Sequence, residues 1–205
     1  MPTILGFDLS RTHSAAFCST NTSFEWGTDV NKSLRQLPRG QLFLDLRKWV
    51  SVVVRGALLT GGALSPIMVG VENYAFGMVQ RSHHLGEIGG IVRCEVSRLL
   101  LNHEGPIYFA EVSPLSAKRW MMGGFRTEMV DGKKKVQYPS KFDMVYMAQG
   151  FGVDTKDHNV ADAFAVARFV GECFNCAKRV LDGIVGDGYI ERFLINTGLD
   201  GSRVL

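Results

Sequence analysis

Short apolar runs separated by polar turns open the chain. Residues 3–9 form the first run, which ends beside a carboxylate, and residues 14–19 and 23–30 read as two more strands joined by the polar turn at residues 20–22. Three short strands with tight connections predict an antiparallel meander at the start of the fold.

Helical and strand patterns alternate after this meander. Apolar residues recur every three to four positions over residues 42–53, over the segment 77–101 and over residues 160–174, which predicts three long helices. Unbroken apolar runs at residues 67–71 and 107–110 are typical of parallel strands that are buried on both faces. This order predicts an α/β fold in which helices flank a five-stranded mixed sheet, three strands antiparallel and then two parallel.

The segment between the last strand and the last helix is less regular. Residues 113–121 and 140–150 predict short helices, whereas the glycine- and lysine-rich stretch at 123–135 is assigned no regular element. No internal repeat and no interdomain linker interrupts the pattern, so we expect residues 1–205 to form a single domain.

The composition fits a globular protein. Of the 205 residues, 46% are hydrophobic and 21% are charged, which excludes a disordered chain and a small disulfide-stapled scaffold. No apolar run approaches the roughly 20 residues that a membrane span needs, and the first residues resemble neither a signal nor a transit peptide. We therefore expect a cytoplasmic protein without a membrane partner.

Three carboxylates stand in places where an ordinary core position would be unfavourable. Asp8 ends the first apolar run, Glu72 ends the fourth strand, and Asp162 interrupts the apolar stripe of the last helix. Burying an unpaired charge costs several kcal/mol, so each carboxylate needs a cation, a partner or water. A cluster of oxygen ligands suits Mg²⁺ or Mn²⁺, and two such ions about 3.5–4 Å apart would activate a water for phosphodiester hydrolysis.

These carboxylates and the residues around them resemble the RuvC family of Holliday junction resolvases, nucleases with a ribonuclease H-like fold. The segments that carry the resemblance are residues 4–10, 69–73, 112–118 with the glycine pair at 123–124, and 159–167, in the family's order. The resemblance implies Asp8, Glu72 and Asp162 as ligands of two Mg²⁺ ions in each active site. It also implies a homodimer that makes paired nicks in four-way junction DNA, without a nucleotide cofactor.

The fourth ligand position departs from the family's pattern. Family members carry an Asp or His three residues before the last acid, and this chain has Asn159 there, beside Asp157 and His158. Carboxylate suits Mg²⁺ better than imidazole does, so we favour Asp157 as the fourth metal ligand and as a residue of the catalytic site. The carbonyl oxygen of Asn159 is the next alternative, and His158 is a third, as a ligand or a proton-transfer group.

The region after the fifth strand is rich in cations suited to phosphate binding. A basic segment of this kind binds DNA backbones without reading sequence. Lys118 can in addition stabilise charge that develops on the scissile phosphate. Tyr74 and Phe76, just past Glu72, are candidates for stacking on an unpaired base. The candidate DNA-binding cations are Lys118, Arg119, Arg126, Lys133, Lys134, Lys135 and Lys141.

The expected function is metal-dependent cleavage of four-way DNA junctions. Other functional interpretations of the same residues are also considered. Related ribonuclease H-like nucleases act on flaps or RNA–DNA hybrids, and a junction-binding scaffold without catalysis is a further alternative. The opening residues 6–12 also resemble the phosphate loop of sugar kinases and actin-like ATPases, but 205 residues do not provide their two lobes. A compact chain of this type points to a bacterial or bacteriophage source.

Overall fold

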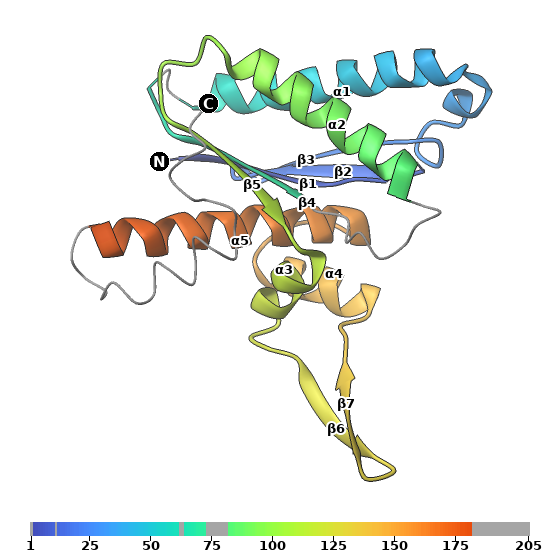
Figure 1. Cartoon of the computed structure of the whole chain (residues 1–205), viewed down its shortest axis with the longest axis vertical. Helices are drawn as coiled ribbons and strands as arrows, with labels where there is room; N and C mark the ends of the chain where they lie inside the picture. Colours follow the sequence, from blue (N-terminus) through green and yellow to red (C-terminus); the bar gives the residue numbers. More distant parts are fainter. Residues whose placement is uncertain (1, 11, 62–63, 73–81, 182–205) are drawn as a thin grey trace.

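The computed structural model describes residues 2–10, 12–61, 64–72 and 82–181, and in this part of the chain a five-stranded mixed sheet forms the centre (Figure 1). The strand order is β3-β2-β1-β4-β5, with the first three strands antiparallel to their neighbours and β1, β4 and β5 parallel. The predicted meander followed by two parallel strands is confirmed. The strands are β1 (Thr3–Asp8), β2 (Ser14–Cys18), β3 (Thr22–Trp26), β4 (Ile67–Glu72) and β5 (Ile107–Val112).

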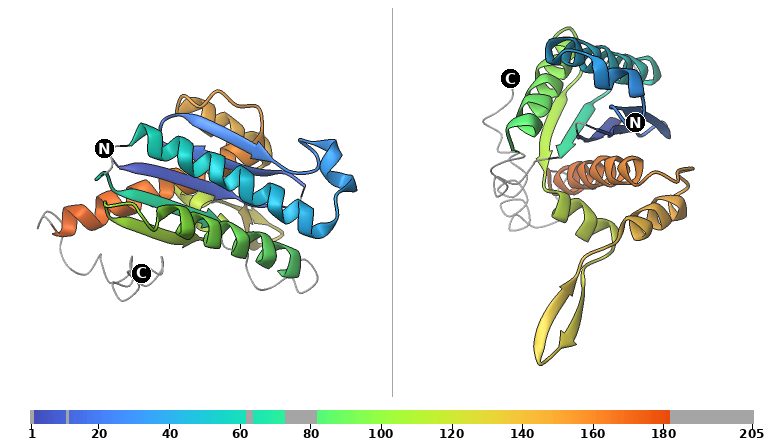
Figure 2. Two further views of the ribbon diagram at one scale, coloured as in Figure 1. Left: turned by 90° about the horizontal axis from the view of Figure 1, so that it is seen from above. Right: turned by 90° about the vertical axis from the view of Figure 1, so that its right-hand side faces the viewer.

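Helices cover both faces of the sheet. The two helices α1 and α2 lie on one face, and α5 crosses the other face with α3 and α4 packed against it (Figures 1 and 2). Among the described residues, no helix is both long enough and apolar enough to cross a bilayer. The helices are the 3₁₀ turn η1 (Lys32–Gln36), α1 (Arg39–Thr60), α2 (Ser82–Leu100), α3 (Pro114–Met121), α4 (Lys141–Gly150) and α5 (His158–Leu181).

Side chains alternate between the two faces of the central strands, and this alternation creates two separate apolar cores. In β1, Leu5 and Phe7 point toward α1 and α2, whereas Gly6 faces α5. In β4, Val69 and Val71 belong to the α1/α2 side and Met68 to the α5 side. The same alternation directs Asp8 and Glu72, the last residues of their strands, to the face that α5 covers.

Two glycines let α5 approach the sheet closely. A Cβ atom on Gly6 would collide with the Ala163 carbonyl oxygen and the Ala167 amide nitrogen of α5. A Cβ on Gly70 would lie 2.7 Å from Val170 Cγ2. Because Gly6 and Gly70 are register partners on β1 and β4, they form one shallow trough in which α5 rests. Any larger residue there would push the helix away from the sheet.

The glycine- and lysine-rich stretch, left without a regular element by the sequence pattern, forms a second, two-stranded sheet. Strands β6 (Arg126–Val130) and β7 (Lys133–Gln137) pair as an antiparallel hairpin that projects away from the body of the molecule (Figures 1 and 2). Asp131 and Gly132 at its tip have φ angles of 51° and 73°. Positive φ at both central positions is the geometry of a two-residue hairpin turn, which Asp-Gly favours.

Other element boundaries differ from the expected ones. Strand β3 ends at Trp26, before the predicted residue 30, because Gly27 has a φ of 135° and turns the chain against the backbone of Thr12. The predicted helix over 77–101 is observed as α2 from Ser82 to Leu100, and its first predicted residues lie outside the described ones. The turn η1 carries no long apolar stripe, so periodicity did not predict it.

Candidate active site

Asp8 and Glu72 end neighbouring parallel strands. The register of β1 and β4, which pairs Phe7 with Val71, brings the two carboxyl groups to adjacent positions at one edge of the sheet. Each residue is only 9% exposed. Two carboxylates are thus held close together with little water around them, as the positions of both residues at strand ends predicted.

Both carboxyl groups of this pair have raised pKa values. Burial is the main reason that the pKa of Asp8 is well above its ordinary value, and hydrogen bonding and charge repulsion from Glu72 add to it. Burial likewise raises the pKa of Glu72. The pair therefore holds a proton more tightly than free carboxyl groups do.

Asp162 comes from the first turns of α5 and faces this pair. Its charge raises the pKa values of both Asp8 and Glu72, which places the three acids in one electrostatic cluster. Lys118 Nζ of α3 donates a hydrogen bond to Asp162 Oδ2 at 2.8 Å. The second oxygen, Asp162 Oδ1, is buried and accepts no hydrogen bond from the described residues. A buried carboxylate oxygen without a hydrogen-bond donor is suited to coordinate a cation.

Lys118 is the cation that partly balances the cluster. Burial alone would lower its pKa, but the charge and hydrogen bond of Asp162 and the other two carboxylates outweigh burial and raise it. Lys118 is therefore charged at neutral pH, and one lysine faces three acids. The α3 helix that carries it packs on α5, so the ammonium group and Asp162 are held as a unit.

The donor set fits a hard divalent cation. Among the described residues, one lysine faces three converging carboxyl groups, and Asp162 Oδ1 accepts no hydrogen bond. Burial raises the pKa values of Asp8 and Glu72 and thus disfavours their charged forms. The repulsion among these carboxylates would be relieved beside a divalent cation, and oxygen ligands of this kind suit Mg²⁺ or Mn²⁺. The residues that would hold such an ion are Asp8, Glu72 and Asp162.

Asp157 belongs to a different set of contacts. Its Oδ2 lies 2.7 Å from His13 Nε2, and its Oδ1 accepts a hydrogen bond from the backbone amide of Asn159 at 2.8 Å. Glu25 Oε2 of β3 approaches the same His13 nitrogen at 3.1 Å. Asp157 thus caps the start of α5 and ties it to the β2–β3 side of the sheet. It is not among the groups whose charges shift the pKa values of Asp8 and Glu72.

Nothing in the sequence indicated the roles of His13 and Glu25, since both lie far from Asp157 along the chain. One ligand atom from each of the three residues lies within 4.8 Å of the others. His158, the neighbour of Asp157, feels the charge of Asp162, and its pKa is lowered by burial first and then by Lys141. His158 and Lys141 therefore lie at the rim of the carboxylate cluster.

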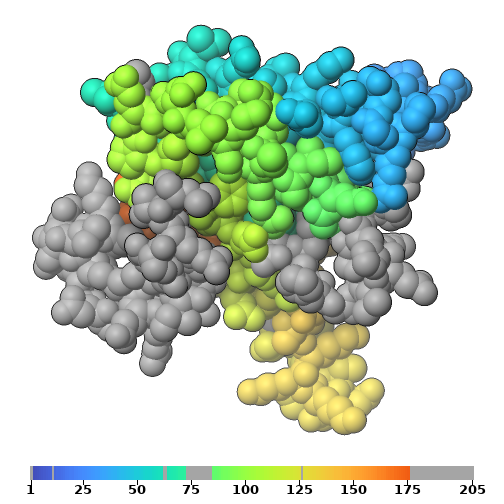
Figure 3. Space-filling model, turned by 45° about the horizontal axis from the view of Figure 1, so that its top comes forward, coloured from blue at the N-terminus to red at the C-terminus, as the bar shows by residue number. Residues whose placement is uncertain are grey.

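The other candidate DNA-binding residues occupy three places. Lys118 lies beside the carboxylates, and Lys141 lies close enough to His158 to lower its pKa. The guanidinium carbon of Arg119 lies 4.9 Å from the centre of the Phe125 ring. Lys133, Lys134 and Lys135 are exposed on β7. Figure 3 shows that this segment projects from the body of the molecule. Arg126 lies in β6, with its side chain outside what the structure describes. Tyr74 and Phe76 also lie outside the described residues.

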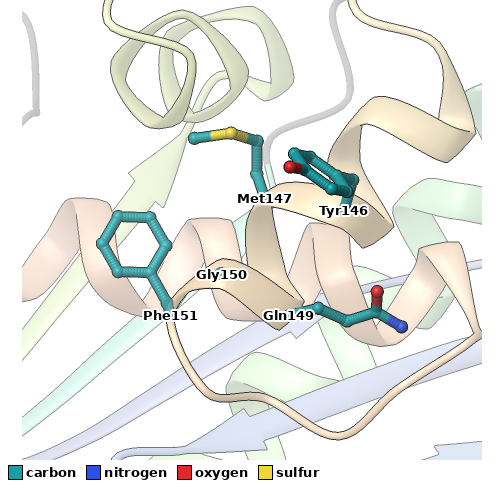
Figure 4. Close-up of a pocket in the computed structure, with 5 residues that line it drawn as sticks. All are labelled: Tyr146, Met147, Gln149, Gly150 and Phe151. Carbon is teal, nitrogen blue, oxygen red and sulfur yellow. The ribbon is translucent and has the colours of Figure 1, made fainter.

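A surface pocket of about 300 Å³ lies elsewhere, at the end of α4. Its lining consists of Tyr146, Met147, Gln149, Gly150 and Phe151 (Figure 4). This lining carries no charged side chain. The chemistry of the described part of the chain is concentrated at the carboxylate cluster.

Comparisons with known proteins identify the fold. The structure of Thermus thermophilus RuvC aligns with a TM-score of 0.51 and 18% identity, covering 82% of this chain and 92% of that one. T. thermophilus RuvC in complex with Holliday junction substrate aligns with a TM-score of 0.52 and 17% identity over the same shares. No family model and no curated protein matches the sequence. The chain therefore has a RuvC-like, ribonuclease H-like α/β fold, which confirms the predicted fold class.

Proposed function

We propose that this protein is a divalent-metal-dependent endonuclease that cleaves branched DNA, four-way junctions above all. The observation that carries the proposal is the cluster of buried Asp8 and Glu72 with Asp162, whose Oδ1 atom accepts no hydrogen bond from the described residues. Such a cluster is unfavourable unless a cation occupies it. Similarity to a RuvC structure that was determined with a Holliday junction substrate supports branched DNA as the substrate.

The proposed roles follow from the contacts of each residue. Asp8, Glu72 and Asp162 hold Mg²⁺, with Mn²⁺ as a substitute, as the pair of ions per active site that the sequence resemblance implies. When bound, these ions activate a water and stabilise the leaving oxygen of the scissile phosphodiester. Lys118 orients Asp162 through its 2.8 Å hydrogen bond and supplies a positive charge beside the site. Lys141 adds a second cation at the rim for the substrate's phosphates.

Paired cleavage of a four-way junction requires two active sites. We propose a homodimer, in which each protomer cuts one of two opposed strands. The exposed cations on α3, on the hairpin and at the start of α4 then provide the backbone contacts that hold the DNA across the dimer.

Cleavage assays with a matched control test this proposal. The protein is incubated with labelled four-way junctions, flaps, linear duplex and RNA–DNA hybrids, with Mg²⁺ or with EDTA. We expect paired nicks in the junction with Mg²⁺ alone, their loss in Asp8→Asn, and their retention in Asp154→Asn, which makes the same change on an exposed residue. Equal cleavage by Asp8→Asn would overturn the proposal. Preferred cleavage of flaps or hybrids would assign a related nuclease activity, and binding without any cleavage would assign a scaffold.

The fourth oxygen ligand is proposed to be Asp157, reaching the site from the turn before α5. Its present contacts with His13 and the Asn159 amide supply a test that separates two roles. If Asp157 is a ligand, Asp157→Asn raises the Mg²⁺ concentration needed for half-maximal cleavage. If it only caps α5 and binds His13, the variant lowers the melting temperature and leaves that concentration unchanged, as His13→Ala would. Asn159→Ala and His158→Ala measured beside it examine the two alternatives.

A further inference from the structure

The β6–β7 hairpin has two chemically different faces. Cross-strand pairing places Glu128 opposite Lys135 and Val130 opposite Lys133, and these positions alternate with a second set on the other face. That second face carries Met129, 66% exposed, and Val136, 40% exposed, with Lys134 opposite Met129. One face of the hairpin therefore carries Lys133 and Lys135 beside Glu128 and Val130, the other carries Met129 and Val136 beside Thr127 and Lys134, and both faces are open to solvent.

The base of the hairpin is fixed to the helix that bears Lys118. Phe125 and Tyr138, which flank the two strands, pack edge to face with ring centres 5.3 Å apart. The guanidinium group of Arg119, the next residue after Lys118, stacks over Phe125. The hairpin is thus joined to α3 and, through α3, to the carboxylate cluster. Its position relative to the scissile phosphate is therefore set by α3.

An isolated two-stranded hairpin is marginally stable in water. The strands of this hairpin pack chiefly against each other, and neither contributes a residue to the two apolar cores. Met129 and Val136 are exposed on this projecting ribbon, so they are accessible to a second molecule.

Charge identifies the chemistry of that partner. Between Arg126 and Gln137 the chain carries four cations, three of them consecutive, and two acids. Lys133 and Lys135 are two residues apart on β7, or about 6.8 Å, so both point from the same face of the hairpin and present two neighbouring cations to a phosphate backbone. Three consecutive lysines also discourage a second copy of the hairpin from adding to this edge.

We propose that the β6–β7 hairpin is a DNA-gripping arm that lies in the minor groove of a duplex arm of the substrate. Lys133 and Lys135 contact the phosphates at the groove's edge, and Met129 and Val136 lie against the sugars and bases inside it. Proteins that bind the minor groove commonly combine cations with an apolar wedge that partly unstacks a base step. The inference rests on the proposed function, and it adds a contact remote from the scissile phosphate that favours a bendable, branched substrate.

Three variants in an Asp8→Asn background, which leaves the DNA uncut, test the arm. The first replaces residues 127–136 by an Asn-Gly turn, which the pairing of Arg126 with Gln137 allows. The second is Lys133→Gln/Lys134→Gln/Lys135→Gln, and the third is Met129→Ser/Val136→Thr. A matched control, Lys32→Gln/Lys48→Gln/Arg55→Gln, removes three exposed cations from η1 and α1. Circular dichroism verifies that each variant is folded.

The readouts are anisotropy titrations of a labelled four-way junction at several salt concentrations and hydroxyl-radical protection of its sugars. We expect the triple-lysine variant to reduce the slope of log affinity against log salt by about 1.8, since Lys133 and Lys135 each lose a phosphate contact that contributes about 0.9. The methionine–valine variant should keep the salt slope, lose severalfold in affinity and lose the minor-groove protection. The shortened arm should combine both losses, and the control should change the slope by less than one.

Wild-type affinity and slope in the shortened arm would overturn the proposal. Unchanged affinity and protection in the methionine–valine variant would also overturn it. If the shortened arm changes the oligomeric state in sedimentation and leaves DNA binding unchanged, the hairpin is a protein contact and the proposal is wrong. All of these readouts come from a protein that does not cleave. Absence of cleavage by the unsubstituted chain would therefore refute the proposed function and leave the result for the arm intact.

Discussion

Replacing Asp8 by Asn should abolish cleavage and at the same time stabilise the metal-free protein. Asp8 is buried beside Glu72, and its pKa is raised first by burial and then by the hydrogen bond and charge of that neighbour. Asn occupies the same volume, donates a hydrogen bond to the Glu72 carboxylate, and carries no charge. The variant thus removes an electrostatic penalty that the folded protein tolerates only because a cation relieves it.

The size of this effect depends on pH in a defined way. Since the pKa of Asp8 in the folded state is higher than the ordinary 3.8, the folded protein binds this proton more tightly than the unfolded chain does. Its contribution to stability is full below the unfolded pKa and is lost as the pH rises through the folded pKa. The loss amounts to about 1.4 kcal/mol for each unit between the two pKa values. Asn has no proton to lose, so the variant's advantage grows over this window and then levels off.

The assay is urea unfolding at pH values from about 3.5 to about 8, first in EDTA and then with Mg²⁺. This range covers the pH values at which a raised carboxyl pKa changes the free energy of unfolding. In EDTA we expect Asp8→Asn and the wild type to be equally stable at the acid end and the variant to be more stable at neutral pH. With Mg²⁺ at 100 times its dissociation constant, the wild type should gain about 2.7 kcal/mol and the variant much less. Asp154→Asn should behave as the wild type throughout. A variant that is less stable than the wild type in EDTA at neutral pH would refute this electrostatic reasoning.

Three further predictions follow from individual contacts. Gly6→Ala forces α5 away from the sheet, so we expect a loss of about 1–3 kcal/mol in urea unfolding together with reduced cleavage; unchanged stability would contradict the close packing. Lys118→Met removes a charge that lowers the pKa values of Asp8 and Glu72. These two pKa values should therefore rise further, and the pH profile of cleavage should shift to higher pH at fixed Mg²⁺. Gly132→Val is strained at a φ of 73°, so it should weaken junction binding in anisotropy titrations without changing the melting temperature of the main body.

The central sheet and the three acids were accessible to sequence reasoning because both depend on short-range rules. Alternation along β1 and β4 fixes which side chains face α5, and a carboxylate that ends an apolar strand is directed by the same rule. The helical period of α5 places Asp162 among buried neighbours. Parallel pairing of adjacent strands then brings their ends together, as was found for Asp8 and Glu72.

The hairpin was missed although a local signal was present. Consecutive lysines are usual in solvated loops, and their charge hides the alternation of β7. The Asp131–Gly132 pair, followed by Lys133–Gln137 and preceded by Arg126–Val130, is the pattern of a two-residue hairpin turn. The contacts of Asp157 with His13 carry no local signal, because they join segments distant in sequence through the packing of α5 on the sheet.

The two apolar cores on opposite faces of the sheet have a consequence for how such a protein can change over evolutionary time. The carboxylates and Lys118 all belong to the α5 side, whereas the contacts of α1 and α2 are made on the other side of the strands. Substitutions on the α1/α2 side can accumulate and compensate one another there without displacing Asp8, Glu72 or Asp162. Substitutions on the α5 side, by contrast, act on the packing that positions these three acids, so the constraint from the site falls mainly on one face of the sheet.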